Sequence, residues 1–263
     1  MAVRLEGKCI VLDMREGEPA VSGTTAIWQQ IGKRIGAEAI SLRVLEFAPG
    51  LSGGIRNENS DEVLYFLESL NDTGGGPARA TVYIDGWPVE TGPQTGIYLS
   101  AGRTLTLDNS GPGAIILISS QCPEPETGPS LVDPLTSPKP GTMYSDAATL
   151  VSLADRKSIP TGNRWYRVLV DEEVGSKQVT QFVGSIPPGR APDHFHTYEE
   201  VLFILRGQGR LWAGQSNTPI GPGSCVYLPK GQVHCVENIG DDELRLLGVF
   251  YPAGSPSVRY DAD

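Results

Sequence analysis

The chain has 263 residues, of which 39% are hydrophobic and 20% are charged, a composition typical of folded proteins and not of disordered ones. Its 21 basic and 31 acidic residues give a formal net charge of -10, so the long-range field repels polyphosphates and anionic membranes. We therefore expect neither a nucleic-acid partner nor a membrane partner.

Short strand patterns, broken by Gly, Pro, Asn and Asp, follow one another along almost the whole chain. In the first half the expected strands cover residues 41–48, 62–67, 79–85, 104–108 and 114–119. In the second half they cover residues 165–171, 178–186, 201–205, 210–213, 225–228, 233–237 and 244–250. Helix is conceivable only around residues 24–34 and 146–157. The sequence therefore predicts an all-β protein built as a sandwich, jelly roll or barrel.

A proline-rich segment divides the chain. Residues 123–140 contain six prolines, which cannot donate to a strand ladder and which hold the backbone extended. We predict an N-terminal domain over residues 1–122, a linker over 123–145 and a C-terminal domain over 146–263. The two halves repeat each other, because residues 47–68 align with 186–206, given one inserted residue, and residues 96–109 align with 225–238. This pattern indicates a tandem duplication of one β domain.

All three histidines of the chain lie in the second repeat, at His194, His196 and His234. Alternate side chains of a strand share a face, so His194, His196 and Glu200 are expected to point into the barrel. Three imidazoles and a carboxylate would be costly to bury as unrelated groups, whereas one divalent metal satisfies all four. We predict that these four residues bind a metal; hydrogen-bonded strand histidines are the alternative. Glu199 has the opposite parity and is predicted to be solvated.

The second repeat resembles the two motifs of the cupin family. Residues 189–207 hold the pattern His-x-His, three residues, Glu, six residues, Gly, although the gap from Gly189 to His194 is one residue shorter than usual. The segment GSCVYLPKGQVHCVEN matches the second motif at Gly223, Pro229, Gly231, His234 and Asn238. Together with the internal repeat, the resemblance covers most of the chain. It implies a bicupin, with tandem double-stranded β-helix (jelly-roll) barrels.

The first repeat departs from this pattern. Its four ligand positions hold Arg56, Glu58, Glu62 and Leu105, and a guanidinium and an aliphatic chain cannot replace imidazoles. We predict a structural charge network that joins Arg56 to Glu58 and Glu62, with a second small-molecule site as the alternative. The cofactor is therefore expected to be one divalent transition metal (Fe, Mn, Ni, Cu or Zn) in the C-terminal domain.

Four protein ligands on a metal that prefers six leave two positions for a substrate, which favours an enzyme acting on a small molecule. The resemblance implies an oxygen-dependent, dioxygenase-like oxidoreductase as the first choice. A metal-dependent hydrolase or isomerase, with a layout like ureidoglycine aminohydrolase, and a non-catalytic metabolite-binding cupin are the alternatives. Oxalate decarboxylation is less favoured, since bicupins of that kind usually carry ligands in both barrels. Tyr198 as proton donor and Arg190 as carboxylate clamp are the candidate catalytic residues, and Leu202 and Ile204 are expected to line the cavity.

The remaining expectations concern the cell and the assembly. The N-terminal residues lack an export signal, so we expect a cytoplasmic protein whose four cysteines are thiols. Exposed edge strands could pair with a second copy of the chain, so a homodimer is a possible assembly.

Overall fold

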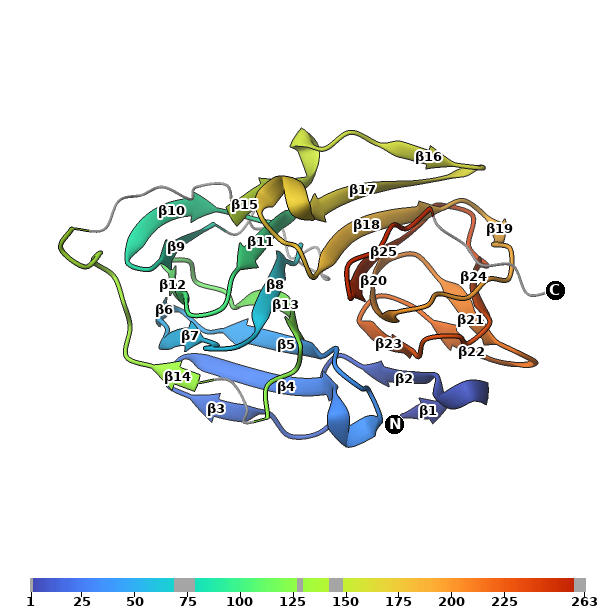
Figure 1. The fold of residues 1–263 in the computed structure, drawn as a ribbon, viewed down its shortest axis with the longest axis horizontal. Coiled ribbons are helices and arrows are strands. Elements are labelled where there is room, and N and C mark those ends of the chain that lie inside the picture. Colours follow the sequence, from blue (N-terminus) through green and yellow to red (C-terminus); the bar gives the residue numbers. More distant parts are fainter. Residues whose placement is uncertain (1, 69–78, 127–129, 142–148, 258–263) are drawn as a thin grey trace.

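The computed structural model describes residues 2–68, 79–126, 130–141 and 149–257, and these residues form two β-barrels that lie side by side (Figure 1). Every regular element among them is a strand or a short 3-10 turn, so the all-β prediction is confirmed. None of the described helices has the length and apolar character needed to cross a membrane.

The first barrel packs two antiparallel sheets face to face. The larger sheet has the strand order β15-β11-β8-β13-β5-β4-β3 and the smaller one the order β10-β9-β12-β7-β14, with β6 also paired to β12. The strands of the larger sheet are β3 (Ala20–Ser22), β4 (Thr25–Ile31), β5 (Leu42–Phe47), β8 (Asp61–Phe66), β11 (Thr95–Leu99), β13 (Ile115–Cys122) and β15 (Leu150–Ser152). Those of the smaller sheet are β6 (Gly50–Leu51), β7 (Gly54–Arg56), β9 (Ala80–Ile84), β10 (Trp87–Thr91), β12 (Thr104–Asn109) and β14 (Ser130–Val132).

The second barrel repeats this plan. Its larger sheet has the order β1-β2-β23-β20-β25-β18-β17-β16, and its smaller sheet the order β19-β24-β21-β22. The larger sheet contains β1 (Val3–Arg4), β2 (Ile10–Asp13), β16 (Ile159–Thr161), β17 (Arg164–Val170), β18 (Thr180–Ile186), β20 (Glu199–Arg206), β23 (Ser224–Leu228) and β25 (Leu244–Tyr251). The smaller one contains β19 (Gly189–Arg190), β21 (Gly209–Ala213), β22 (Ser216–Ile220) and β24 (His234–Asn238).

The two segments for which helix was conceivable are mainly strand. Residues 25–31 form β4, and a 3-10 turn, Lys33–Ile35, follows. In the second segment, β15 precedes a 3-10 turn at Leu153–Asp155, while residues 146–148 lie outside the described part of the chain. Residues 25–31 adopt a strand rather than a helix because Thr25, Ile27 and Trp28 have high strand propensity and pair with β5.

Asparagines at the ends of β12 and β24 confirm the internal repeat. The side-chain amide of Asn238 donates to the carbonyls of Ile186 and Asp242, at 2.8 and 2.7 Å. The amide of Asn109 donates to the carbonyls of Phe47 and Gly113, at 3.0 and 2.8 Å. Each asparagine therefore closes the same turn in its own barrel.

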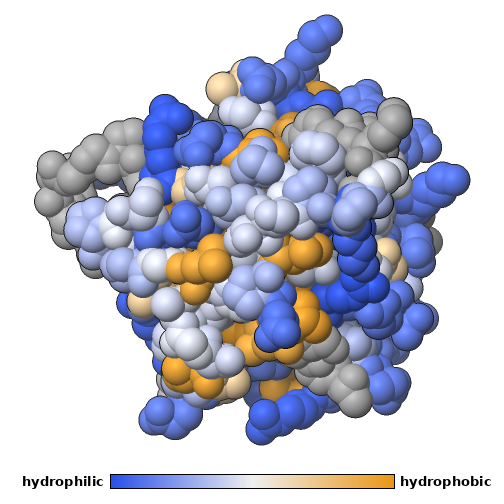
Figure 2. Space-filling view, turned by 90° about the vertical axis from the view of Figure 1, so that its left-hand side faces the viewer, coloured by the Kyte–Doolittle hydropathy of each residue, from blue (hydrophilic) through white to orange (hydrophobic). Residues whose placement is uncertain are grey.

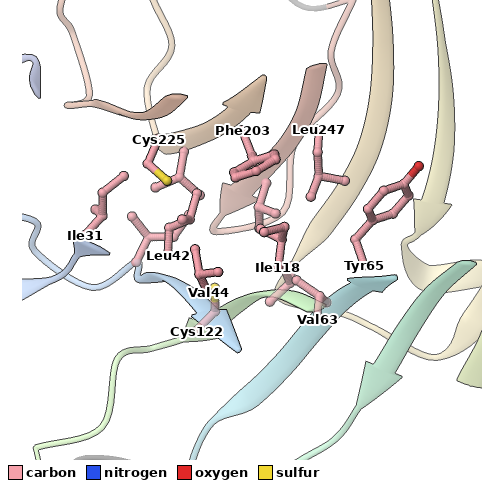
Figure 3. Close-up of a cluster of buried hydrophobic side chains, with 14 of the residues drawn as sticks. Ile31, Leu42, Val44, Val63, Tyr65, Ile118, Cys122, Phe203, Cys225 and Leu247 are labelled. Atoms are coloured by element: carbon pink, nitrogen blue, oxygen red, sulfur yellow. The ribbon is translucent and has the colours of Figure 1, made fainter. Parts of the chain in front are cut away.

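Each barrel has its own apolar interior, and a third apolar cluster lies between the barrels. Strand β20 explains this arrangement, because Leu202 and Ile204 face the interior of the second barrel while Val201 and Phe203 face the first barrel. Figure 3 shows Phe203 and Leu247 of the second barrel packed close to side chains of the first barrel, among them Ile118. The larger sheets are thus buried on both faces.

Strands also cross between the two halves of the sequence. Strand β2, near the N-terminus, pairs with β23 of the second barrel, and β15, which follows the proline-rich segment, pairs with β11 of the first. The proline-rich segment itself adds β14 to the smaller sheet of the first barrel. The domain limits predicted from the sequence stay a prediction. Strands from one side of these limits form hydrogen-bonded pairs with strands of the barrel on the other side.

Glu199 lies in the layer between the barrels, and the prediction that it is solvated is wrong. Only 4% of the residue is exposed. Its carboxylate accepts hydrogen bonds from the backbone N–H groups of Glu38, Ala39 and Ile40 in the first barrel, at 2.7, 2.7 and 3.1 Å. Strand parity places Glu199 on the outer face of its own barrel, and the first barrel covers that face.

The outer surface is mixed. The side of the molecule at the left in Figure 1 carries separate apolar patches with polar residues between them (Figure 2). Large exposed apolar side chains on strands β6 and β14 include Leu51, Leu131 and Val132, which are 42%, 38% and 37% exposed. A homodimer stays a prediction. All four cysteines are buried and free, as the sequence predicts.

Candidate metal centre

The backbone brings His194 and His234 together in the second barrel. They form an antiparallel bridge in which His194 N–H donates to the His234 carbonyl at 3.1 Å and His234 N–H donates to the His194 carbonyl at 2.8 Å. The turn before His234 is hydrogen-bonded to the segment that carries the other two histidines, because Gly231 N–H donates to the His196 carbonyl at 2.7 Å. Gly231 has a φ of 77°, a conformation that a side chain would disfavour.

The four predicted ligands converge. Donor atoms of His194, His196 and His234 all lie within 4.8 Å of one another. Glu200 Oε2 lies 3.6 Å from the Nε2 atoms of both His196 and His234. Ligand atoms that share one first-row metal ion are roughly 3 to 4 Å apart, so small side-chain shifts would let one ion contact this set. Glu200 is 5% exposed, which removes competing water from its carboxylate.

Backbone carbonyls fix which nitrogen faces the centre. His194 Nδ1 lies 3.0 Å from the Pro192 carbonyl, and His234 Nδ1 lies 2.8 Å from the Gln232 carbonyl. A carbonyl oxygen can only accept, so each Nδ1 carries the proton and each Nε2 offers its lone pair to the centre. An outer hydrogen bond of this kind is typical of histidines that bind metals.

The electrostatics suit a cation. Burial, followed by the neighbouring His234, lowers the pKa of His194 to about 4, and burial lowers the pKa of His196. Both imidazoles are therefore neutral at pH 7. For Glu200, burial opposes ionisation, but the nearby histidines hold its pKa below the ordinary value. Neutral imidazoles and an ionised carboxylate are the protonation states that a divalent metal requires.

Tyr198 lies behind His196. The two rings stack at a centroid distance of 4.9 Å and an interplanar angle of 13°. The Tyr198 hydroxyl donates to the Ser255 carbonyl at 3.2 Å, in the segment that follows β25. His196 Nδ1 is buried without a hydrogen-bond partner among the described residues, so stacking is what orients this ring. A proton-donor role for Tyr198 would require its hydroxyl to leave Ser255.

Arg190 lies away from the cavity. Its guanidinium carbon is 4.3 Å from the centroid of the Trp212 ring, its Nε donates to Cys235 Sγ at 3.2 Å, and its Nη2 pairs with Asp193 at 3.0 Å. To clamp a carboxylate in the cavity, as the sequence analysis expects, the side chain would have to leave all three partners.

The predicted ligands lie at the base of a cavity of about 600 Å³, which includes space open to solvent. Its walls are mostly apolar. Besides the four ligands, it is lined by Thr161, Arg164, Trp165, Tyr166, Phe182, Gly184, Ser185, Ile186, Ala191, Leu202, Val236, Leu246, Phe250 and Pro256. Leu202 is in the wall as expected, whereas Ile204 is in the apolar interior of the barrel and not among these residues.

The first barrel has a different interior at the equivalent place. Glu62, the counterpart of Glu200, is fully buried and pairs with the guanidinium of Arg43, while Ser119 Oγ and Asn57 Nδ2 donate to it, each at 2.5 Å. Arg56 instead forms a two-bond pair with Glu58, at 2.6 and 3.1 Å, that is partly open to solvent. The prediction of one network joining Arg56, Glu58 and Glu62 is therefore wrong.

Strand register explains why the two interiors differ. Arg43 is opposite Ser119 in the first barrel, and the corresponding strands of the second barrel place Phe182 opposite Gly248. Arg43 thus supplies a permanent positive charge to Glu62, while Phe182 leaves Glu200 facing the histidines. Sequence reasoning missed Arg43 and Phe182, although an arginine in an otherwise apolar strand, SLRVLEF, was a visible signal.

Comparison with known proteins agrees with the fold. Residues 182–250 match the family model described as the cupin domain. An oxalate decarboxylase from Lactobacillus farciminis, solved as a formate complex, superposes with a TM-score of 0.71 at 14% identity, over 93% of this chain and 87% of that one. The protein Ylba from E. coli superposes with a TM-score of 0.71 at 13% identity, over 95% of this chain and 93% of that one. The second barrel thus matches the cupin domain, and the fold of the whole chain is that of a bicupin.

Curated relatives match only part of the chain. Auxin-binding protein T92 from Nicotiana tabacum is 34% identical over 99 residues, which cover 33% of this chain and 53% of that protein. An oxalate-binding protein from Thermotoga maritima is 33% identical over 66 residues, which cover 24% of this chain and 54% of that protein. The chain thus spans about half the length of the curated relatives that it matches.

Proposed function

We propose that the second barrel binds one divalent transition metal through His194, His196, Glu200 and His234, and that the chain is a metal-dependent enzyme acting on a small organic substrate. One observation carries the proposal: three imidazoles and an ionised carboxylate converge at the base of an apolar cavity. A metal bound there would polarise a substrate oxygen and, if it has an accessible redox change, activate dioxygen.

The residues around the centre have separate tasks. Glu200 supplies the one negative charge of the ligand set, and the carbonyls of Pro192 and Gln232 hold two imidazoles with Nε2 inward. Phe182 and Phe250 belong to the wall that excludes water from a bound substrate. A metal that prefers six ligands would keep two positions for the substrate besides these four residues.

One metal per chain follows from the first barrel. Arg43 already neutralises Glu62, and the positions equivalent to the three histidines hold Arg56, Glu58 and Leu105. A divalent cation there would meet guanidinium groups, because both carboxylates of the set, Glu58 and Glu62, are already paired with arginines.

Within this proposal, an oxygen-dependent oxidoreductase of the dioxygenase type is the first choice. A hydrolase or isomerase would use the same ligands without a redox change. A non-catalytic metabolite-binding cupin is favoured by a separate observation, since matched relatives are named for binding auxin and oxalate. Turnover separates a binder from an enzyme, because a binder releases its ligand unchanged.

Metal identity and oxygen uptake test the proposal. Protein purified without added metal is analysed for its elements, and oxygen consumption is then measured with catechol-like and diketone-like substrates. Iron, manganese, nickel or copper, with oxygen uptake that vanishes in His234→Ala, is the expected result. Zinc, or turnover that proceeds equally well without oxygen, would replace the oxidoreductase by the hydrolase or isomerase.

A further inference from the structure

A second cavity lies between the two barrels, apart from the metal centre. Its volume is about 780 Å³, which includes space open to solvent and is large enough for a small molecule. Both barrels line it, because Tyr65 belongs to β8 of the first barrel, while Val183 and Arg245 belong to β18 and β25 of the second. Its described lining includes none of the four predicted metal ligands. A ligand bound here would therefore contact both barrels and no metal.

The hydroxyl of Tyr65 has no partner in this cavity. Only 2% of the residue is exposed, and no hydrogen bond joins its hydroxyl to the part of the chain that the structure describes. Figure 3 shows the hydroxyl directed away from the apolar side chains of Val63 and Leu247. Burial, followed by the charge of Glu68, raises the pKa of Tyr65, while the charge of Arg245 lowers it, so both charges lie near the hydroxyl. A buried donor without a partner favours a ligand that brings an acceptor oxygen.

The charged groups that line the cavity have a surplus of positive charge. Arg206 and Arg245 are accompanied there by one acid, Glu68, among the described residues. The side chains of Arg206 and Asp242 are 62% and 86% exposed and lie 3.7 Å apart, and an ion pair of this kind is weak. In a chain with a net charge of -10, this cavity is a place where an anion is attracted.

Arg245 is positioned by its own barrel but keeps donors for a ligand. Its Nη2 pairs with Glu243, and its guanidinium carbon lies 5.7 Å from the centroid of the Trp165 ring. Its Nε is buried and has no hydrogen-bond partner. A guanidinium has five N–H groups, so the pair with Glu243 leaves others for a second carboxylate.

The rest of the wall is apolar. It is built from Leu67, Leu153, Val183, Leu205 and Pro222. The first three belong to the apolar cluster between the barrels, and Leu205 packs against that cluster. An inorganic anion such as phosphate would leave this surface in contact with water, whereas the apolar part of an organic anion would cover it.

We propose that the cavity between the barrels binds a small carboxylic acid with an apolar body. The carboxylate accepts hydrogen bonds from the Tyr65 hydroxyl and from the guanidinium of Arg245, and Arg206 adds positive charge. The apolar body packs against Leu153 and Val183. The metal takes no part, so this site stands or falls independently of the proposed function.

The test uses benzoate, which has both parts, together with acetate and benzyl alcohol, which each lack one. Binding is measured by calorimetry on the whole protein and again on His196→Ala, because a carboxylate can also bind to a metal. We expect benzoate binding to persist in His196→Ala and to be about tenfold tighter there than that of either partial probe. Adding Tyr65→Phe should weaken it about tenfold, the size of one hydrogen bond to a charged group.

Tyr83→Phe is the matched control, because no hydrogen bond is described for the Tyr83 hydroxyl and Tyr83 does not line this cavity. It should leave the affinity for benzoate unchanged. Tyr65→Phe should unfold at no lower urea concentration than the wild type, since the hydroxyl that it removes has no partner in the protein. A lower midpoint would show that the hydroxyl already has a partner, and would overturn the inference.

Three further results would also overturn it. They are the absence of benzoate binding in His196→Ala, an affinity for benzoate that is unchanged by Tyr65→Phe, and acetate binding as tight as that of benzoate. The last result would mean a site for small anions that does not use the apolar wall.

Discussion

Tyr227 donates its hydroxyl to the carboxylate of Glu199 at 2.6 Å, inside the layer that joins the two barrels. Tyr98 and Asp61 form the equivalent pair in the first barrel, at 3.1 Å. Burial, followed by the hydrogen bond to the acid, raises the pKa of Tyr227 and makes it a lasting donor. Glu199 directly precedes Glu200, and Asp61 directly precedes Glu62. In each barrel, therefore, the first acid of the pair faces the interface between the barrels and the second faces the barrel interior.

Removing the hydroxyl in Tyr227→Phe should lower the free energy of unfolding by about 1–3 kcal/mol, because a buried carboxylate loses a donor. Urea denaturation measures the change. Metal content should stay the same, since Glu200 faces away from the interface. Tyr83→Phe is the control, because no hydrogen bond is described for that hydroxyl. Equal effects of the two substitutions would mean that the Tyr227 contact does not stabilise the fold.

Arg43→Leu should destabilise the first barrel by about 3–5 kcal/mol, since it leaves the buried carboxylate of Glu62 without its counter-charge. Adding Glu62→Gln to Arg43→Leu should recover part of this loss, which denaturation of the single and double variants would measure. If the two effects simply add, the pair is not coupled and Arg43 does not serve as the counter-charge of Glu62.

The sequence predicted the ligand face well but not what surrounds it. Strand alternation placed His194, His196 and Glu200 on one side, because that parity is local. Strand alternation could not reveal that the first barrel covers Glu199, because it predicts which face a side chain lies on and not what packs against that face. Arg190 was expected to clamp a carboxylate in the cavity, but its planar guanidinium packs on Trp212, a contact between β19 and β21 that no local pattern reveals.

Acid should destabilise the metal-free protein. His194 has a pKa of about 4 when folded and near 6.5 when unfolded, so between these values the unfolded chain binds more protons. The free energy of unfolding should therefore fall as the pH drops from about 6.5 to 4. In His194→Gln this fall should be smaller, as followed by denaturation of chelated samples across that range. An identical slope in the variant would show that burial of His194 is not its cause.

Gly248→Ala should narrow the cavity without removing the metal. The added Cβ would come within 2.3 Å of the Phe182 ring, which lines the cavity and must then shift. We expect the affinity for 4-methylcatechol to fall by about tenfold, in line with the cost of overpacking, while metal content is unchanged. Gly113→Ala, where nothing lies within 4 Å of the added atom, is the control. Unchanged affinity in Gly248→Ala would mean that the ring does not border the bound molecule.

We propose that one barrel binds a metal and that the other has an arginine in its place. Elemental analysis of the whole protein, with the concentration taken from amino-acid analysis, tests this most directly. We predict one equivalent of a divalent transition metal per chain in the wild type and in Glu62→Ala, and none in His196→Ala. Two equivalents in the wild type, or a full equivalent that persists in His196→Ala, would show that the metal is not bound by the second barrel alone through these residues.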